Sequence, residues 1–205
     1  MRKGRETREK LMDIAEAAVL TKGFGATSIE EIIAEAEITK SGFFYHFKDK
    51  SELARALLQR YLESEEEILD NLFVRARELH DDPLHAFLIG LKLFSEMMAD
   101  LPNGHPGCLV ATYCYNERLF DRDVRDLNRQ AVLCWRARFL KTFEEIAELY
   151  PPRDKVDLEA LADMVSNTVE GGIVMSKAVR EPEVLSEQIM LLRSYIKLLF
   201  TPMQN

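Results

Sequence analysis

The feature that most constrains the fold is a pair of short helices joined by a tight turn between residues 28 and 47. Ser28 and Glu31 have the spacing of a capping box, in which two side chains satisfy the unpaired N–H groups at a helix start. Thr39 can cap a second helix after a connection of about three residues, and Lys48-Asp49-Lys50 ends it. The segment therefore predicts a helix-turn-helix, which requires a preceding helix to pack against.

The rest of the chain has the same helical periodicity. Leu11, Ile14 and Ala18 lie on one face of a first helix that ends at Lys22-Gly23. Helix-forming residues dominate the composition, and prolines and glycines fall mostly at expected helix ends. We therefore expect an all-α fold, with Ser51 capping the fourth helix. The later helices are predicted at 51–79, 83–100, 108–120, 122–149, 158–179 and 184–200.

Composition limits the class of protein. The net charge of −8 argues weakly against a nucleic-acid partner, but cations cluster locally, and phosphate neutralisation is a local effect. The basic start runs into acidic residues, and no apolar stretch approaches the ~20 residues of a membrane span, so we expect a cytoplasmic protein without a secretory signal. Three cysteines without a C-x-x-C pair suggest reduced thiols. The clustered cations are Arg2, Lys3, Arg5, Arg8, Lys10, Lys40, Lys48 and Lys50.

The second helix of the pair carries the chemistry of a DNA-reading helix. Small residues at its start permit close approach to base edges, and hydroxyl, imidazole and ammonium groups can donate to phosphates. Phe43 and Phe47 are instead interpreted as core residues, because buried aromatic rings dominate small cores. The predicted DNA-binding residues are Thr27, Ser28, Thr39, Lys40, Ser41, Gly42, Tyr45, His46, Lys48 and Lys50.

Residues 7–55 resemble the TetR-type (TetR/AcrR) family of transcription regulators. The resemblance rests on Gly23-Phe24, on Thr27 to Ile32, and on Ile38 to Lys50 with its Phe43-Phe44-Tyr45-His46-Phe47 run. It implies about nine helices, a DNA-binding domain at 1–50 and an effector-binding and dimerisation domain at 51–205. It also implies a homodimer on a palindromic operator, repression rather than activation, and release by a small molecule.

Two positions depart from the family pattern. Glu37 stands where the turn commonly has glycine, so a positive φ would cost roughly 1 kcal/mol there, or a different turn would form. Phe44 stands where the family often has a phosphate-binding tyrosine, so Tyr45 and His46 would have to supply those contacts.

The C-terminal part offers candidates for dimerisation. Adjacent glycines are costly in a helix, at ~1 kcal/mol each, so Gly171-Gly172 indicates close helix approach at a dimer interface, or alternatively a kink or a ligand-facing bend. The resemblance implies dimerisation through the last two helices. The predicted interface residues are Gly171, Gly172, Leu192, Tyr195, Ile196 and Leu199.

An effector pocket is implied by the resemblance alone. Each candidate for its lining has ordinary core packing as the alternative interpretation. The candidates are Met97, Met98, Cys108, Tyr113, Trp135, Phe139 and Met175.

Several other functions were weighed. Cys108 follows a glycine- and proline-rich loop at a predicted helix start, where the helix dipole favours thiolate, so a redox or electrophile sensor is one alternative. A regulator without an effector is another. An enzyme is disfavoured, because the sequence has no nucleophile elbow or phosphate loop. His80, Asp81, Asp82 and His85 form the only plausible metal cluster, but they straddle a helix break where polar residues are expected anyway, so neither a metal nor a cofactor is predicted.

Overall fold

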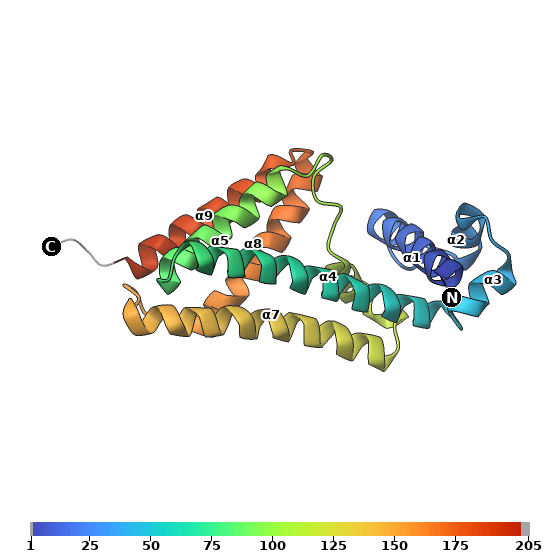
Figure 1. Ribbon diagram of the computed structural model, residues 1–205, viewed down its shortest axis with the longest axis horizontal. Coiled ribbons are helices and arrows are strands. Elements are labelled where there is room, and N and C mark those ends of the chain that lie inside the picture. Colours follow the sequence, from blue (N-terminus) through green and yellow to red (C-terminus); the bar gives the residue numbers. More distant parts are fainter. Residues whose placement is uncertain (1, 202–205) are drawn as a thin grey trace. The chain divides into compact units, whose positions relative to one another are not determined.

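The computed structural model describes residues 2–201, with side chains from residue 4, and every regular element in that range is a helix (Figure 1). This confirms the predicted all-α class. In chain order the elements are α1 (Arg2–Lys22), α2 (Ile29–Ala36), α3 (Lys40–His46), α4 (Lys50–Leu79), α5 (Pro83–Ala99), α6 (Leu109–Tyr115), the 3₁₀ turn η1 (Glu117–Leu119), α7 (Arg122–Leu149), α8 (Leu158–Val179) and α9 (Glu183–Phe200).

The chain forms two compact units. The first comprises residues 1–65 and 106–131, and the second comprises residues 66–105 and 132–205. Helices α4 and α7 are each divided between the two units, at residues 65/66 and 131/132. The segment 1–50, for which we predicted a DNA-binding domain, lies within the first unit. None of the helices in the described range has the length and apolar character needed to cross a membrane.

The predicted helix caps account for the starts of α2, α3 and α5. Ser28 Oγ accepts the N–H of Glu31 at 3.2 Å, and Thr39 Oγ1 accepts the N–H of Gly42 at 3.1 Å. These bonds satisfy N–H groups that the helix itself leaves unpaired. The side chain of Asp82 caps α5 in the same way, with Pro83 in the first turn as predicted.

The main differences from the prediction are the cap of α4 and the length of α6. Helix α4 begins at Lys50, before Ser51, and Asp49 rather than Ser51 accepts the N–H of Glu52, at 2.8 Å. The Glu52 carboxylate accepts the N–H of Lys48 at 2.7 Å, so an acidic pair performs the capping. The predicted helix at 108–120 is shorter, because α6 ends at Tyr115 and a 3₁₀ turn follows.

The core of the first unit is aromatic. The rings of Tyr113 and Phe120 stack with their centroids 4.2 Å apart, and Phe24 contacts both. The Tyr113 hydroxyl donates to the carbonyl oxygen of Ala54 at 2.8 Å, and burial raises the pKa of this tyrosine. These contacts fix α6 against the N-terminal part of α4.

An ionic brace joins α1 to α4. The Arg60 guanidinium contacts Glu9 at 3.3 Å, Asp13 at 2.7 Å and Glu16 at 2.7 Å. The three carboxylates lie four and three residues apart, which places them along one face of α1. Burial lowers the pKa of Arg60, but the bonds to Glu16 and Asp13 outweigh it, so the net shift is upward.

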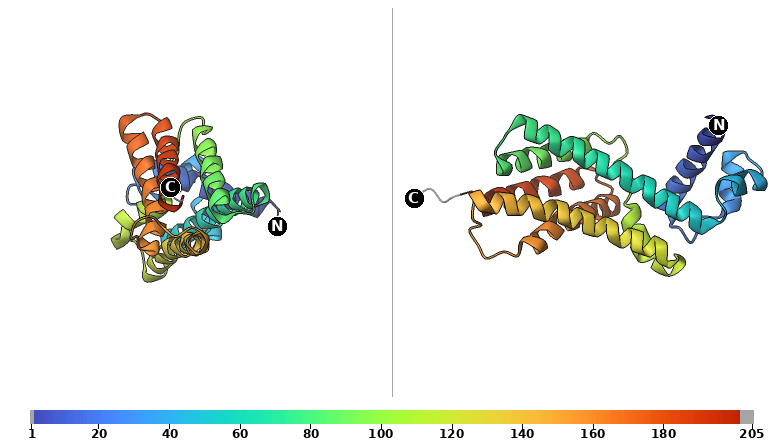
Figure 2. Two further views of the ribbon diagram at one scale, coloured as in Figure 1. Left: turned by 90° about the vertical axis from the view of Figure 1, so that its left-hand side faces the viewer. Right: turned by 60° about the horizontal axis from the view of Figure 1, so that its bottom comes forward.

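The second unit is built around α9, which packs against α5 and α8 (Figures 1 and 2). Gly172 is buried, and a Cβ atom added there would lie 2.8 Å from Leu185 Cδ1 and 3.2 Å from Leu185 Cα. The bare backbone of Gly172 therefore permits the close approach of α8 and α9 within one chain.

Candidate nucleic-acid interface

Two phenylalanines hold α3 in place. Phe43 and Phe47 are both 0% exposed, which confirms the core interpretation. The Arg8 guanidinium of α1 lies over the Phe47 ring, 4.9 Å from its centroid. The buried face of α3 is thus fixed by residues that carry no sequence-reading chemistry.

The opposite face of α3 is presented to solvent. Tyr45 is 82% exposed, and Thr39, Lys40 and Ser41 are exposed beside it. The hydroxyls of Thr39 and Ser41 lie 3.0 Å apart. This face offers hydroxyl, phenol and ammonium donors on a helix whose other face is locked, which is the arrangement that direct reading of a DNA groove needs.

The turn before α3 has the strained conformation considered in the sequence analysis. Glu37 has φ 57° and ψ 42°, in the left-handed region, and its N–H donates to the carbonyl oxygen of Ala34 at 3.2 Å. Lys10 of α1 donates to the carbonyl oxygen of Ala36 at 2.9 Å. The usual turn therefore forms without glycine, held by a lysine from the first helix.

Carboxylates of α2 moderate the charge of this surface. Lys40 Nζ lies 3.8 Å from Glu30, and Lys22 is paired with Glu31. Both residues of the Lys40–Glu30 pair are mostly exposed, so Lys40 remains available to a stronger anion such as a phosphate. Lys48 is also exposed.

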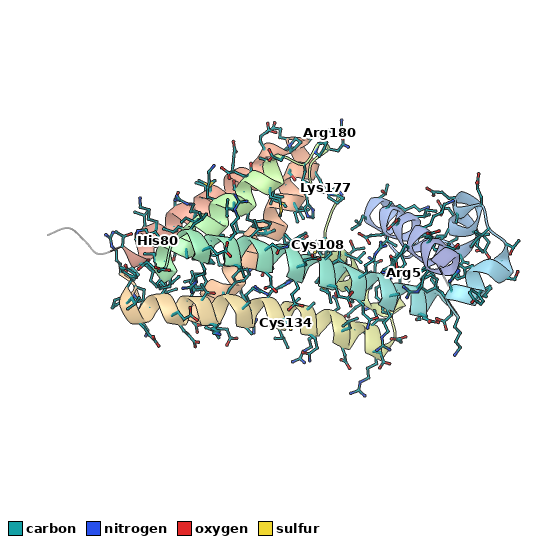
Figure 3. The ribbon with its side chains drawn as sticks, viewed as in Figure 1. Arg5, His80, Cys108, Cys134, Lys177 and Arg180 are labelled. Carbon is teal, nitrogen blue, oxygen red and sulfur yellow. The ribbon has the colours of Figure 1, made fainter. Side chains whose placement is uncertain are left out.

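The basic start of α1 adds a further cation. Arg5 is exposed on α1 (Figure 3). The side chains of Arg2 and Lys3, also expected in the basic cluster, lie outside the described residues.

The structure corrects the predicted roles of Thr27 and Lys50. Thr27 is 2% exposed, and its hydroxyl donates to the carbonyl oxygen of Gly23 at 3.0 Å. Lys50 donates to the carbonyl oxygen of Phe24 at 2.8 Å and lies over the Phe24 ring, and burial lowers its pKa. Both polar groups are used inside the unit, because the loop at residues 23–28 needs partners for its carbonyl groups.

Three other residues predicted to contact DNA, Ser28, Gly42 and His46, already make contacts within the chain. Ser28 is exposed, but its oxygen already caps α2. The N–H of Gly42 is capped by Thr39, and His46 is half-buried with its ring edge-on to Tyr45. Phe44 is 43% exposed at the position where the family often has tyrosine.

Comparison with known proteins identifies this arrangement. Residues 11–57 match the sequence model of a family described as bacterial regulatory proteins, tetR family. The transcriptional regulator AcuR of Cereibacter sphaeroides is 26% identical over 167 residues, which are 80% of this chain and 73% of AcuR. The chain is a TetR-family transcriptional regulator.

One further sequence relative matches part of the regulator, and one solved structure matches nearly all of it. The transcriptional repressor BepR of Brucella suis is 31% identical over 94 residues, which are 44% of either chain. A TetR transcriptional regulator from Chloroflexus aurantiacus has a TM-score of 0.77 and 25% identity, covering 96% of this chain and 97% of that one. The family match and the fold are those of regulators rather than enzymes.

The predicted effector residues of the regulator are divided between the two units. Tyr113 belongs to the aromatic core of the first unit, and Met175 is 51% exposed on α8. Met98 is buried, and Met97 and Trp135 are half-buried. Phe139 lines a hollow in the second unit, and Cys108 is the N-cap of α6. Tyr113 and Cys108 belong to the first unit, and the other five belong to the second.

The predicted dimer residues divide between two faces of α8 and α9. Leu192, Ile196 and Leu199 are 0–5% exposed, so they face the interior of the regulator rather than a second copy. Tyr195 is 41% exposed, and a Cβ atom added at Gly171 would meet nothing within 4 Å. The outward face also carries apolar residues that the sequence analysis missed: Val174, Leu191 and Leu198.

A histidine cluster lies at the corner between α4 and α5, where Figure 3 labels His80. His80, Asp82 and His85 have candidate ligand atoms within 4.8 Å of one another. Their hydrogen bonds already serve the helix start: Asp82 accepts from Tyr150 at 2.6 Å and bonds the His85 ring at 2.7 Å. Burial raises the pKa of Asp82, but these bonds outweigh it and lower the pKa to about 2.

Proposed function

We propose that this regulator is a dimeric, ligand-responsive repressor that acts in the cytoplasm and places each α3 in one half of a palindromic operator. The observation that supports this most is that α3 is fixed on one side by the buried Phe43 and the buried C-cap residue Phe47, and presents an exposed polar face on the other. BepR, which is similar to this chain over 94 residues, is a repressor, and this similarity supports repression rather than activation.

The exposed residues suggest different roles on DNA. Ser41 and Tyr45 lie on the outward face of α3 and would contact base edges, with Tyr45 reaching furthest. Lys40, Lys48 and Thr39 would bind phosphates and set the register of the helix.

The proposal is tested by selecting bound DNA from a random pool with the full chain. We expect an inverted repeat with half-sites about one helical turn apart. Lys40→Ala combined with Tyr45→Ala should weaken binding to the selected site at least about thirtyfold, since two groups worth ~1–3 kcal/mol each are removed.

The matched control is Lys141→Ala with Tyr115→Ala, which removes an exposed lysine and an exposed tyrosine from α7 and α6. It should bind the operator like the wild type. Recovery of no enriched sequence, or unchanged affinity in the α3 variant, would contradict the proposal.

We assign dimerisation to the outward face of α8 and α9. Leu191, Tyr195 and Leu198 recur at helical spacing on α9 and are 62%, 41% and 63% exposed. Val174 and Met175, both 51% exposed, are further exposed apolar residues on the neighbouring helix α8. Exposed apolar side chains at helical spacing mark an association surface, and a second copy would cover them with the same residues.

The effector would act by binding the DNA-competent and DNA-incompetent states with different affinities. A thermal-shift screen of metabolites separates this proposal from an effector-free regulator, because a ligand that binds the folded dimer raises its unfolding temperature. If no compound in the screen raises the unfolding temperature, the result would favour a regulator without a small-molecule effector.

A redox sensor at Cys108 is the second candidate. Cys108 Sγ accepts the N–H of Ala111 at 3.4 Å at the start of α6, and an N–H donor stabilises a thiolate. If Cys108→Ser leaves operator release by oxidants unchanged, this candidate is excluded. Cys114→Ser and Cys134→Ser, at two exposed cysteines, are the controls (Figure 3 labels Cys134).

A further inference from the structure

A partly open hollow of about 70 Å³ lies in the second unit, between α4, α5 and α7. Its floor is aromatic, formed by Phe73, Phe87 and Phe139. Arg77 and Arg138 stand at its rim. An apolar base with a few converging polar groups is the usual composition of a small-molecule site.

The floor is shaped for a flat apolar group. Phe73 and Phe87 stack with centroids 5.5 Å apart and planes 15° apart, and Phe139 meets both rings edge-on. Gly90 makes this possible, because a Cβ atom there would lie 2.5 Å from the Phe73 ring. An aromatic ring in the hollow would meet ring faces and edges in the offset arrangements that aromatic groups favour.

The rim supplies donors for an anion. Arg77 Nη2 contacts Glu145 at 2.6 Å, and Arg138 Nη2 contacts Asp70 at 2.6 Å. A guanidinium has five N–H donors, so each arginine keeps further donors after forming its pair. The two pairs cross between α4 and α7 in opposite directions and set one arginine on either helix.

The partner carboxylates can be replaced. Asp70 and Glu145 are 55% and 43% exposed, so either can turn into water when another carboxylate approaches its arginine. A bidentate bond to a guanidinium is stronger than the single contact seen in each pair. Each arginine is neutralised by its partner carboxylate, so the hollow carries no net positive charge that would attract an anion. A preference for a carboxylate ligand would therefore come from the geometry of the guanidinium N–H donors.

We propose that this hollow binds a small aromatic carboxylate, with its ring on the phenylalanine floor and its carboxylate between Arg77 and Arg138. At about 70 Å³ the hollow is smaller than the ~150 Å³ cavity that encloses a benzene ring, so a single ring would rest on its base and extend through the open side. The role of this ligand as the effector rests on the proposed function, whereas the binding site does not.

The test compares phenylacetate with phenylacetamide, its uncharged analogue, by titration calorimetry on the full chain without DNA. We expect phenylacetate to bind at least about tenfold more tightly, which corresponds to ~1.4 kcal/mol. This comparison uses the wild-type chain and does not depend on any variant folding. Equal affinities for the two compounds, or no heat and no thermal shift with phenylacetate at about 10 mM, would overturn the proposal.

Variants then locate the site. Arg77→Gln with Arg138→Gln should remove the preference for the acid. Arg75→Gln with Arg129→Gln removes two exposed arginines from the same helices, outside the hollow, and should keep it. A preference lost in both pairs, or kept in both, would contradict binding at this rim.

Operator release is measured separately. Phenylacetate binding without loss of operator affinity would uphold the site and contradict its assignment as the effector site. A chain that selects no operator would contradict the proposed function and leave the binding result in force.

Discussion

Glu37 occupies a backbone conformation that favours glycine. Its φ of 57° places the Cβ atom close to neighbouring backbone, at a cost of about 1 kcal/mol for most residues. The sequence analysis identified the position but left two outcomes open, because a glycine-free turn could adopt the positive φ or avoid it. Packing decides: Lys10 and the capped start of α3 fix both ends of the turn.

Glu37→Gly should raise the free energy of unfolding by about 0.5 to 1 kcal/mol, since it relieves strain and costs some backbone entropy. The measurement is urea unfolding. The matched control is Gly23→Ala, at φ 85° with nothing within 4 Å of the added Cβ, which should lose a similar amount. A stability loss in Glu37→Gly would show that its side chain contributes more than the strain costs.

Tyr150→Phe should weaken the acid dependence of stability. The pKa of Asp82 is lowered from 3.8 to about 2 in the folded chain, so its contribution is present above pH 3.8 and is lost as the pH falls toward 2. Removing the tyrosine hydroxyl raises this pKa and flattens the loss in that window.

Unfolding curves measured between pH 5 and 2 check this prediction. Tyr115→Phe, at a tyrosine that is 85% exposed, is the control and should follow the wild type. Identical acid profiles for the Tyr150 variant and the wild type would contradict the role given to this hydrogen bond.

At the scale of helices, end signals predict boundaries well because caps and breakers act locally. Faces are harder to predict, and α9 shows why. Leucine, tyrosine or isoleucine stands at 191, 192, 195, 196, 198 and 199, so helical periodicity fits two adjacent faces equally well. Only packing against α5 and α8 shows that 192, 196 and 199 are interior. The hollow could not be predicted from its arginines either, because charged residues on a helix usually mark a solvent-exposed face.

Gly172→Ala should lower the free energy of unfolding by about 1 to 3 kcal/mol, because its Cβ would overlap Leu185, including backbone, and force α8 from α9. Thermal unfolding measures this. The control is Gly171→Ala, because a Cβ atom added at Gly171 meets nothing within 4 Å. This variant should keep the helical content of the protomer. Equal stability of the Gly172 variant and the wild type would mean that the two helices separate at little cost.

At the scale of the whole molecule, the chain carries an apolar face that its own helices leave uncovered. Leu191 and Leu198 on this face are 62% and 63% exposed, and burying two such side chains is worth roughly 3 to 6 kcal/mol. A two-fold interface counts every contact twice, so a modest face can hold a stable dimer.

Leu191→Glu with Leu198→Glu should convert the dimer to a monomer in sedimentation equilibrium, because unpaired charges would be buried at the interface. Leu149→Glu, at a 62% exposed leucine on α7, should remain dimeric. A dimer that survives the double substitution would place the interface elsewhere.

The brace at Arg60 implies an unequal tolerance of sequence drift. Three acidic residues share one arginine, so any one of them can be lost while two others keep the contact. Loss of the arginine instead leaves three like charges along one face of α1. Among descendants of this sequence, we expect single substitutions at positions 9, 13 and 16. We expect position 60 to change only after the acidic residues at these positions have been replaced.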